Sequence, residues 1–373
     1  MLLFMDGQAH YDSTRIGMKY SVVTVEGCTW SVVAEGRFGN CIKRVTVGAN
    51  NAGHLGISPL MTRLGPWTPT TSGVCGFAVK VDDLQEVGES GAGVMPSGEE
   101  FFTLMEGSAA HVGLYLNPTG TLSLWRSRFT SSFDKLAESI EGLQSGAWCF
   151  LECKWFIDPT VGTFEIRANG VPIMQFTGNT KGSRNGEEIG IWTGVNLLAA
   201  RPGSGDVVVL RMCDLYLADR VAADPDDVSD FLGDGIVETI LPNGPGSATG
   251  WTPNVGANWD ATNDDPAPDD DATYVTTTAP GITDLYHFED LPPGTLVKGA
   301  HACILARKDS DGGAAIAPVV HQGGTDYVGP TQGISSITYD RYLTQPYDLN
   351  PATMAKFTDA EVNAGQFGVI KIT

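Results

Sequence analysis

The sequence predicts an all-β protein built from two β-sandwiches, the second smaller than the first. Glycine is abundant, with 46 residues among 373, and charged residues make up only 18%, a composition typical of short strands and many turns. Apolar and polar residues alternate in many brief segments, which is the pattern of half-buried strands. A hydrophobic content of 42% is enough to form cores, so global disorder is excluded.

The clearest strand pattern in the N-terminal half is a hairpin around Asn169-Gly170. Alternating runs flank this pair at 163–168 and 171–176. Asn-Gly favours a type I′ turn because both central residues take a positive φ. Pro172 cannot donate a ladder hydrogen bond, so its strand is expected at a sheet edge or a bulge. The same reasoning predicts strands at 76–82, 111–116, 121–126 and 206–217, and a short helix at 132–140.

The chain is expected to divide near residue 222, where an acidic, proline-containing segment begins. Residues 1–221 carry 17 basic and 22 acidic residues, a net charge of −5, whereas residues 222–373 carry 6 and 22, a net charge of −16. We therefore predict one β-sandwich domain over 1–221 and a C-terminal β-sandwich attachment module over 222–373. Its strands are predicted at 235–242, 272–277, 296–307 and 314–320, with 308–313 as the turn between the last two.

The net charge of the whole chain restricts its partners. A formal charge of −21 argues against nucleic acid and against docking on anionic lipid, because both need clustered Lys and Arg. No apolar run reaches the roughly 20 residues that cross a bilayer. The first seven residues are too short for a signal-peptide core and lack a basic flank, so synthesis in a cytoplasm is expected.

Seven cysteines leave at least one thiol unpaired within the chain. There is no C-x-x-C and no zinc-finger spacing. Cys149 and Cys153 would share one face of a strand about 13 Å apart, too far to bridge each other. We interpret the cysteines as small buried apolar residues, with a bridge to another strand or another chain as the alternative.

No common catalytic motif is found. The sequence lacks a P-loop, a G-x-S-x-G elbow, an H-E-x-x-H pair and the alternating carboxylates of sandwich glucanases. We therefore expect a non-enzymatic protein, with no catalytic, cofactor-binding or metal-binding residue assigned. The acidic run 260–271 lacks the glycine and glutamate of an EF-hand loop, so it is interpreted as a solvated loop, with a Ca²⁺ site as the alternative.

The tryptophans are the strongest candidates for contacts. Eight are present, and several lie in turn-rich segments. Exposed aromatic rings stack on sugars or anchor interfaces, whereas buried ones complete sandwich cores. The candidates for contact with a glycan or a partner are Trp67, Trp125, Trp192, Trp251 and Trp259.

Segments over nearly the whole chain share the order of motifs of one known family. They are 2–11, 19–20, 155–171, 214–219, 230–237, 250–253, 306–309, 350–353 and 363–369. This order resembles tailed-bacteriophage virion structural proteins that carry an N-terminal concanavalin A-like (laminin G-like) jelly-roll domain. The chain departs from the family at Lys356-Phe357-Thr358, where relatives continue with a Trp-Thr pair.

The resemblance implies a structural virion protein of the tail or fibre, which presents a lectin-like domain to a host-surface glycan or a neighbouring virion protein. Its partners would be other virion proteins and copies of itself, for example in a trimer, without nucleic acid or membrane insertion. It would be located in the virion after assembly in the host cytoplasm. Two alternatives stay open: a capsid decoration or head-fibre protein, and a polysaccharide hydrolase with a carboxylate pair assembled from distant strands.

Overall fold

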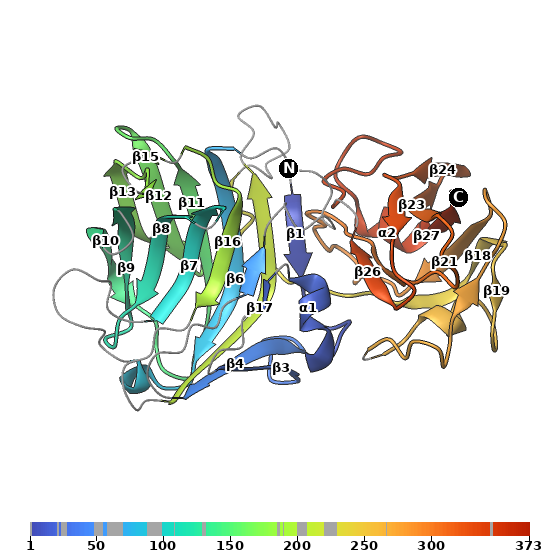
Figure 1. Cartoon of the computed structure of the whole chain (residues 1–373), viewed down its shortest axis with the longest axis horizontal. Coiled ribbons are helices and arrows are strands. Elements are labelled where there is room, and N and C mark those ends of the chain that lie inside the picture. The colour runs from blue at the N-terminus through green and yellow to red at the C-terminus, as the bar shows by residue number, and fades with distance from the viewer. Residues whose placement is uncertain are drawn as a thin grey trace.

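The chain is almost entirely β, which confirms the predicted fold class. Two large sheets form the N-terminal part and a six-stranded sheet dominates the C-terminal part, which lies beside it (Figure 1). The predicted boundary at 221/222 lies outside the described residues. The computed structural model describes residues 2–20, 22–23, 28–47, 55–57, 70–87, 99–107, 109–128, 132–184, 187–188, 190–199, 207–219, 230–265, 267–343 and 346–373.

The first sheet has eight antiparallel strands. In spatial order they are β13 (Val171–Gly178), β12 (Gly162–Ala168), β11 (Trp148–Phe156), β6 (Ser72–Val81), β17 (Val207–Asp219), β4 (Cys41–Val47) and β3 (Cys28–Val33), with β1 (Leu2–Asp6) also paired to β17. Beside β1 lie a 3-10 turn (Ser13–Arg15) and the one-turn helix α1 (Ile16–Lys19).

The second sheet has nine strands. They are β15 (Glu187–Glu188), β14 (Ser183–Arg184), β9 (Thr121–Arg128), β8 (Ala109–Leu116), β7 (Glu99–Glu106), β16 (Gly194–Ala199), β5 (Leu55–Ile57) and β2 (Val22–Val23), with β10 (Ser132–Gly142) also paired to β9. A further 3-10 turn spans Leu84–Glu86.

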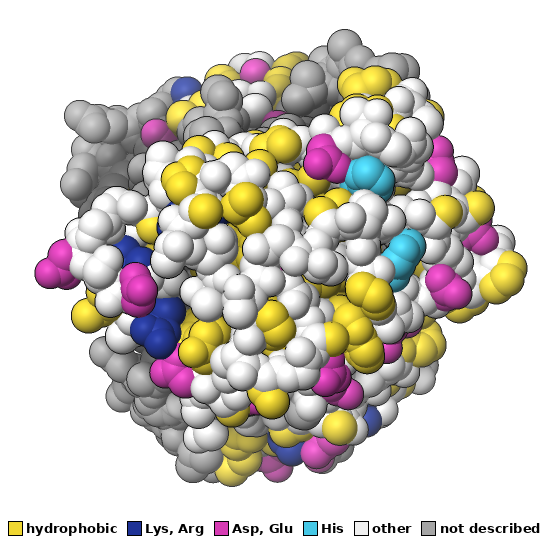
Figure 2. Space-filling view, turned by 90° about the vertical axis from the view of Figure 1, so that its right-hand side faces the viewer, with side chains coloured by type: hydrophobic (Ala, Val, Ile, Leu, Met, Phe, Trp, Pro, Cys, Tyr) yellow, Lys and Arg dark blue, Asp and Glu magenta, His cyan; other side chains and the backbone are white. Residues whose placement is uncertain are grey.

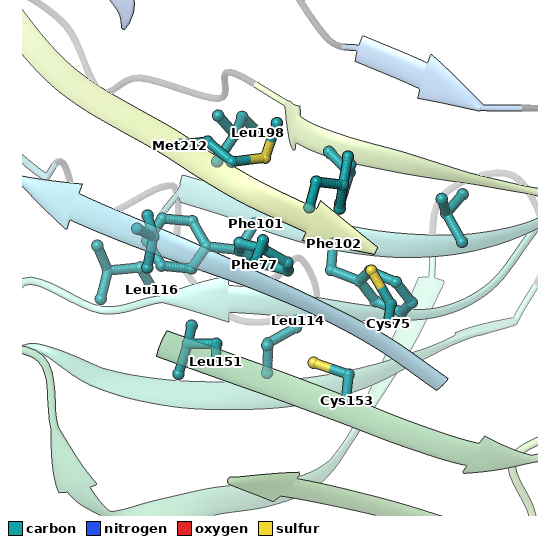
Figure 3. Packing of buried hydrophobic residues seen from close by; sticks show 14 of the residues in the cluster. Cys75, Phe77, Phe101, Phe102, Leu114, Leu116, Leu151, Cys153, Leu198 and Met212 are labelled. Carbon is teal, nitrogen blue, oxygen red and sulfur yellow. The ribbon is translucent and has the colours of Figure 1, made fainter. Parts of the chain in front are cut away.

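The inner faces of the two sheets form one hydrophobic core. Alternate residues of β6, including Phe77 and Val79, point into it, and they meet Phe102 and Leu114 from the opposite sheet. Figure 3 shows Phe77, Phe102 and Leu114 between the strand layers. All four residues, Val79 included, are completely buried.

The predicted hairpin is confirmed in detail. Asn169 and Gly170 have φ of 48° and 79°, the positive values that a type I′ turn needs. Pro172 lies on β13, which is the edge of its sheet, next to a register shift in the β12–β13 ladder. The strand therefore tolerates the missing N–H in both of the ways that the sequence predicts.

An ion pair joins the two sheets inside the core. Arg44 on β4 donates to Glu99 on β7 at 2.6 Å and to the carbonyl of Leu198 at 2.5 Å, and both charged side chains are completely buried. Charges so deep are tolerated only when they are paired and hydrogen-bonded.

A connecting segment, residues 230–241, lies on the outer face of the first sheet. Its Phe231 and Leu232 pack against a second hydrophobic cluster on that face. Glu152 accepts from the N–H of Gly233 at 2.9 Å, and Asp214 accepts from the N–H of Val237 at 3.1 Å. The sheet therefore satisfies the main chain of this segment, which runs towards the C-terminal part.

The C-terminal part has one main sheet and two short ladders. The sheet contains β18 (Pro242–Thr249), β21 (Thr283–Phe288), β27 (Gln366–Lys371), β23 (Ala314–Gln322) and β24 (Thr325–Val328), with β25 (Gln332–Ile334) also paired to β23. The ladders pair β19 (Thr252–Pro253) with β20 (Val275–Thr276) and β22 (Cys303–Ala306) with β26 (Asp340–Leu343), and the helical turns are a 3-10 turn (Asp260–Thr262) and α2 (Asp359–Ala364). Acidic side chains are spread over the face in Figure 2, which views the molecule from the side where this part lies.

The helix predicted at 132–140 is wrong. This segment belongs to strand β10, which pairs with β9 along most of its length. The Leu-Ala-Glu run favours a helix locally, but pairing with β9 satisfies its main chain over more residues than a short isolated helix would.

Two strand predictions in the C-terminal part also need correction. Residues 235–241 form no strand; the N–H of Val237 donates to Asp214 of the first sheet and that of Leu241 to Glu289, rather than to a neighbouring strand. The segment 308–313 does connect β22 to β23 as predicted, but these two strands are not paired with each other, since β22 pairs with β26 and β23 pairs with β27. Of the predicted strand 296–307, only Cys303–Ala306 is extended and paired as a strand.

Candidate functional site

The outer face of the nine-stranded sheet carries polar residues and one tryptophan. Along β9, Leu122 and Leu124 point into the core, so Ser123 and Trp125 point outward. Trp125 lies opposite Gly113 of β8 on one side and Lys135 of β10 on the other. This lateral row forms the centre of the candidate site.

Hydrogen bonds hold the Trp125 indole in place. Its Nε1–H donates to Ser123 Oγ at 2.9 Å, and Ser123 Oγ donates in turn to Asn117 Oδ1 at 3.3 Å. The ring is partly exposed. A fixed, partly exposed indole loses little conformational entropy when a ligand packs on it.

An ionised glutamate lies beside the tryptophan. Glu138 on β10 accepts from Lys135 Nζ at 2.6 Å and from Thr121 Oγ1 at 3.0 Å. The hydrogen bond from Lys135, and then that from Thr121, lowers the pKa of Glu138 below its usual range. Glu138 is therefore a hydrogen-bond acceptor here rather than a proton donor, since a general acid needs a raised pKa.

A second carboxylate lies deeper in the same face. Glu100 on β7 accepts hydrogen bonds from Tyr115 Oη at 3.1 Å and from Thr103 Oγ1, and all three residues are buried. Gly113 makes this arrangement possible, because a Cβ there would lie 2.8 Å from the Tyr115 ring. The tyrosine can therefore fold over the strand towards Glu100.

The two carboxylates are too far apart for paired acid–base hydrolysis. Glu100, Tyr115, Ser123 and Glu138 lie opposite one another on β7, β8, β9 and β10. Three strand spacings separate the glutamates by about 14 Å. Glycosidase carboxylates lie roughly 5–10 Å apart.

His111, on the same strand as Tyr115, has a structural role. Its Nδ1 accepts from the N–H of Gly182 at 3.2 Å, so Nε2 carries the proton and donates to the carbonyl of Ile191 at 2.8 Å. Burial lowers the pKa of His111, so the neutral ring is favoured. It ties β8 to the segment before β16.

The five predicted tryptophans occupy different environments. Trp125 lies on the outer face described above. Trp192 is only 1% exposed and packs edge-on against Trp155, so its assignment as a contact residue is wrong. Trp251 packs against the C-terminal core and donates to the carbonyl of Ile282 at 3.0 Å. Trp259 is partly exposed at the start of a 3-10 turn, and Trp67 lies outside the described residues.

The sequence did not indicate Asn117, Thr121, Lys135 or Glu138 as site residues. The signal that was available is the alternation of β9, which places Ser123 beside Trp125 on one face. The prediction of a helix at 132–140 concealed the roles of Lys135 and Glu138, because these two residues reach this face only when β10 is a strand.

The acidic loop at 260–271 uses part of its charge in ion pairs. Asp270 binds Arg15 of the N-terminal part at 2.9 Å, and Asp271 binds Arg307 at 2.7 Å. Burial, followed by the nearby Asp269, raises the pKa of Asp264. In the described part of the chain, no three His, Cys, Asp or Glu side chains gather as metal ligands. The Ca²⁺ alternative stays a prediction.

No family model matches the chain, and no curated protein matches its sequence. The chain is similar to solved structures at low identity. The marine PL-14 alginate lyase from Aplysia kurodai is 10% identical, with a TM-score of 0.43 over 59% of this chain and 99% of the lyase. A sialidase is 9% identical, with a TM-score of 0.35 over 57% of this chain, and the match spans only 19% of the sialidase. The carbohydrate binding module CBM66 from Bacillus subtilis is 11% identical, with a TM-score of 0.30 over 52% of this chain and 96% of the module.

These comparisons correct the predicted function. The resemblance to phage proteins implied a tail or fibre component of a virion. The similar structures named above are an alginate lyase, a sialidase and a carbohydrate binding module, and none is a virion protein. The predicted virion tail or fibre function is therefore wrong. No helix in the described residues has the length and apolarity to span a membrane.

Proposed function

We propose that this chain is a polysaccharide-active protein that holds a sugar chain against the outer face of β9 and β10, around Trp125. The observation that carries the proposal is the fixed indole of Trp125 within a row of polar side chains. Sugar rings have apolar faces that pack on aromatic rings and hydroxyl edges that need donors and acceptors. Trp125 supplies the first surface, and Thr121, Lys135 and Glu138 supply the second, while the buried Ser123 holds the indole in place.

The geometry supports recognition more directly than hydrolysis by the two glutamates on this face. Glu138 is ionised and lies about 14 Å from Glu100, so these two do not form a hydrolytic pair. The experiment that tests the proposal therefore measures both binding of the polysaccharide and cleavage of its glycosidic bonds.

Replacement of Trp125 tests the proposal. We expect Trp125→Ala to weaken binding to the preferred polysaccharide by tenfold or more, about 1.4 kcal/mol, because the stacking surface is lost. Wild type is first screened on a panel of neutral and acidic polysaccharides by affinity electrophoresis. Reducing ends and unsaturated uronates are then measured as products of hydrolysis and of elimination.

Trp259→Ala is the matched control. This tryptophan is partly exposed in the C-terminal part, away from the proposed face, and its loss is expected to leave binding unchanged. Absence of binding and of products with every polysaccharide would contradict the proposal, as would equal loss of affinity in the two variants.

A further inference from the structure

Two cysteines lie opposite each other on neighbouring strands of the first sheet. β4 and β17 are antiparallel, with Val209 opposite Val45 and Met212 opposite Ile42. The next step along this register brings Cys213 opposite Cys41. Both cysteines are buried, 2% and 0% exposed, in the hydrophobic cluster on the outer face.

The hydrogen-bond ladder shows which kind of pair they form. The N–H of Asp82 donates to the carbonyl of Val209 at 3.1 Å, and these residues lie opposite each other in the β6–β17 register. Val209 therefore bonds towards β6, and alternation gives Cys213 the same orientation, opposite Ala78. The N–H and C=O of a strand residue point to the same neighbouring strand. A residue whose main chain bonds to β6 therefore makes no ladder hydrogen bond to β4. Cys213 and Cys41 thus form a non-hydrogen-bonded pair.

This position suits a disulfide. Directly opposite residues at non-hydrogen-bonded positions have Cα atoms about 4.5 Å apart and closely spaced side chains. Disulfides span Cα separations of about 4.4–6.8 Å, which both kinds of pair satisfy. They also need Cβ atoms about 3.5–4.5 Å apart, which the closer side chains of a non-hydrogen-bonded pair meet better. The bond would join β4 to β17 directly beside Asp214, which holds the connecting segment through Val237.

The same sheet contains an internal comparison on its other face. Cys75 and Cys153 also lie opposite each other, on β6 and β11, and point into the main core (Figure 3). Here the N–H of Ile157 donates to the carbonyl of Thr71, two residues that extend the same register. Alternation makes Cys75 and Cys153 a hydrogen-bonded pair, with Cα atoms about 5.5 Å apart and side chains less favourably placed.

We propose that Cys41 and Cys213 form a disulfide when the chain folds in the presence of a disulfide oxidant such as oxidised glutathione, whereas Cys75 and Cys153 stay reduced. One protein thiolate attacks the glutathione disulfide and releases reduced glutathione. The second protein thiolate then attacks the mixed disulfide and releases another. The two protein thiols lose two protons and two electrons, and one oxidised glutathione becomes two reduced molecules.

The bond forms while the sheet assembles rather than in the finished fold. Burial raises the pKa of Cys41 to about 11, and burial together with the Asp214 carboxylate raises the pKa of Cys213 as well. Thiolate is therefore scarce once β4 and β17 are packed, and oxidation of the folded protein is slow.

Refolding of the full chain in a glutathione redox buffer tests the proposal. After alkylation under denaturing conditions, we expect free thiols to fall from seven to five. Peptide mapping without reduction should recover one cross-link, between Cys41 and Cys213. Wild type that keeps all seven thiols, or a cross-link at Cys75 and Cys153 instead, would overturn the inference.

Matched variants sharpen the result. Cys213→Ser should keep its six thiols after the same treatment, whereas Cys153→Ser should still lose two. Loss of two thiols from Cys213→Ser would contradict the assigned pair. If that variant does not fold, Cys41→Ala gives the same readout, and the wild-type peptide map decides without any variant.

Discussion

The N-terminal and C-terminal parts share a strand pattern but reach different degrees of burial. In the N-terminal part, two large sheets face each other and bury an extensive core. In the C-terminal part, the described core cluster contains Ile316, Ile334 and Val369, with Trp251 and Ile304 packed at its edge. The alternating pattern of a strand indicates which face turns inward, whereas the size of the opposing layer decides how much area is buried.

In the C-terminal part, polar contacts fix a buried carboxylate and a helix start. Asp284 is completely buried and accepts from Asn258 and from the hydroxyl of Tyr286 at 2.7 Å. Thr358 and Glu361 form a capping box at the start of α2. Such contacts fix loops and helix ends with little apolar area, so the two parts should respond differently to the same kind of mutation.

The largest effect is expected at the buried ion pair of the N-terminal part. Glu99→Ala leaves Arg44 charged and unpaired in the core, which should lower the free energy of unfolding by about 3–5 kcal/mol. Urea unfolding measures this loss. The double variant Arg44→Met/Glu99→Leu should be clearly more stable than Glu99→Ala, and a smaller loss in Glu99→Ala than in the double variant would contradict the explanation.

Truncation of one core residue in each part compares the two cores directly. Leu151→Ala, at a completely buried site, should cost about 4 kcal/mol, whereas Ile334→Ala, at an 8% exposed site in a thin layer, should cost about 2 kcal/mol. The thermal unfolding of both variants provides the measurement. Equal costs would show that the C-terminal core is as tightly packed as the other.

Titration of Asp284 should make the stability of the C-terminal part depend on pH. Burial raises the pKa of Asp284 above its usual value, so protonation favours the folded state. This contribution is complete below about pH 3.9 and is lost as the pH rises through the folded-state pKa. Over that interval the unfolded chain releases a proton that the folded chain keeps, so the free energy of unfolding falls as the pH rises.

Asp284→Asn removes this titration. Relative to wild type, the variant should therefore gain stability as the pH rises above about 4, as measured by urea unfolding at several pH values. A stability difference between the two proteins that does not change with pH would contradict the raised pKa.

The smallest effect is expected at the salt bridge between the two parts. Arg15 and Asp270 are 14% and 44% exposed, so solvent and salt screen their attraction. Arg15→Ala should cost less than about 1 kcal/mol, and the cost should shrink further in high salt. A loss above about 2 kcal/mol that persists in high salt would show that this contact is central to the arrangement of the two parts.

The sequence alone determined the local features of this protein. Asn169-Gly170 encodes its turn because few residue pairs adopt two successive positive φ values. Alternation predicted strands at 76–82 and 121–126, which lie in β6 and β9. Composition and alternation together were enough for the all-β class, because period-two burial is a property of each segment.

Only the tertiary structure decided which segments meet. The register of β10 on β9 placed Glu138 beside Ser123, and the packing of the two sheets buried Trp192, although its segment suggests a surface turn. Cys41 and Cys213 are 172 positions apart in the chain and become neighbours only through the β4–β17 ladder. Such pairings depend on the free energy of the whole sheet, which includes contacts between distant segments. The local sequence pattern of one segment therefore cannot predict them.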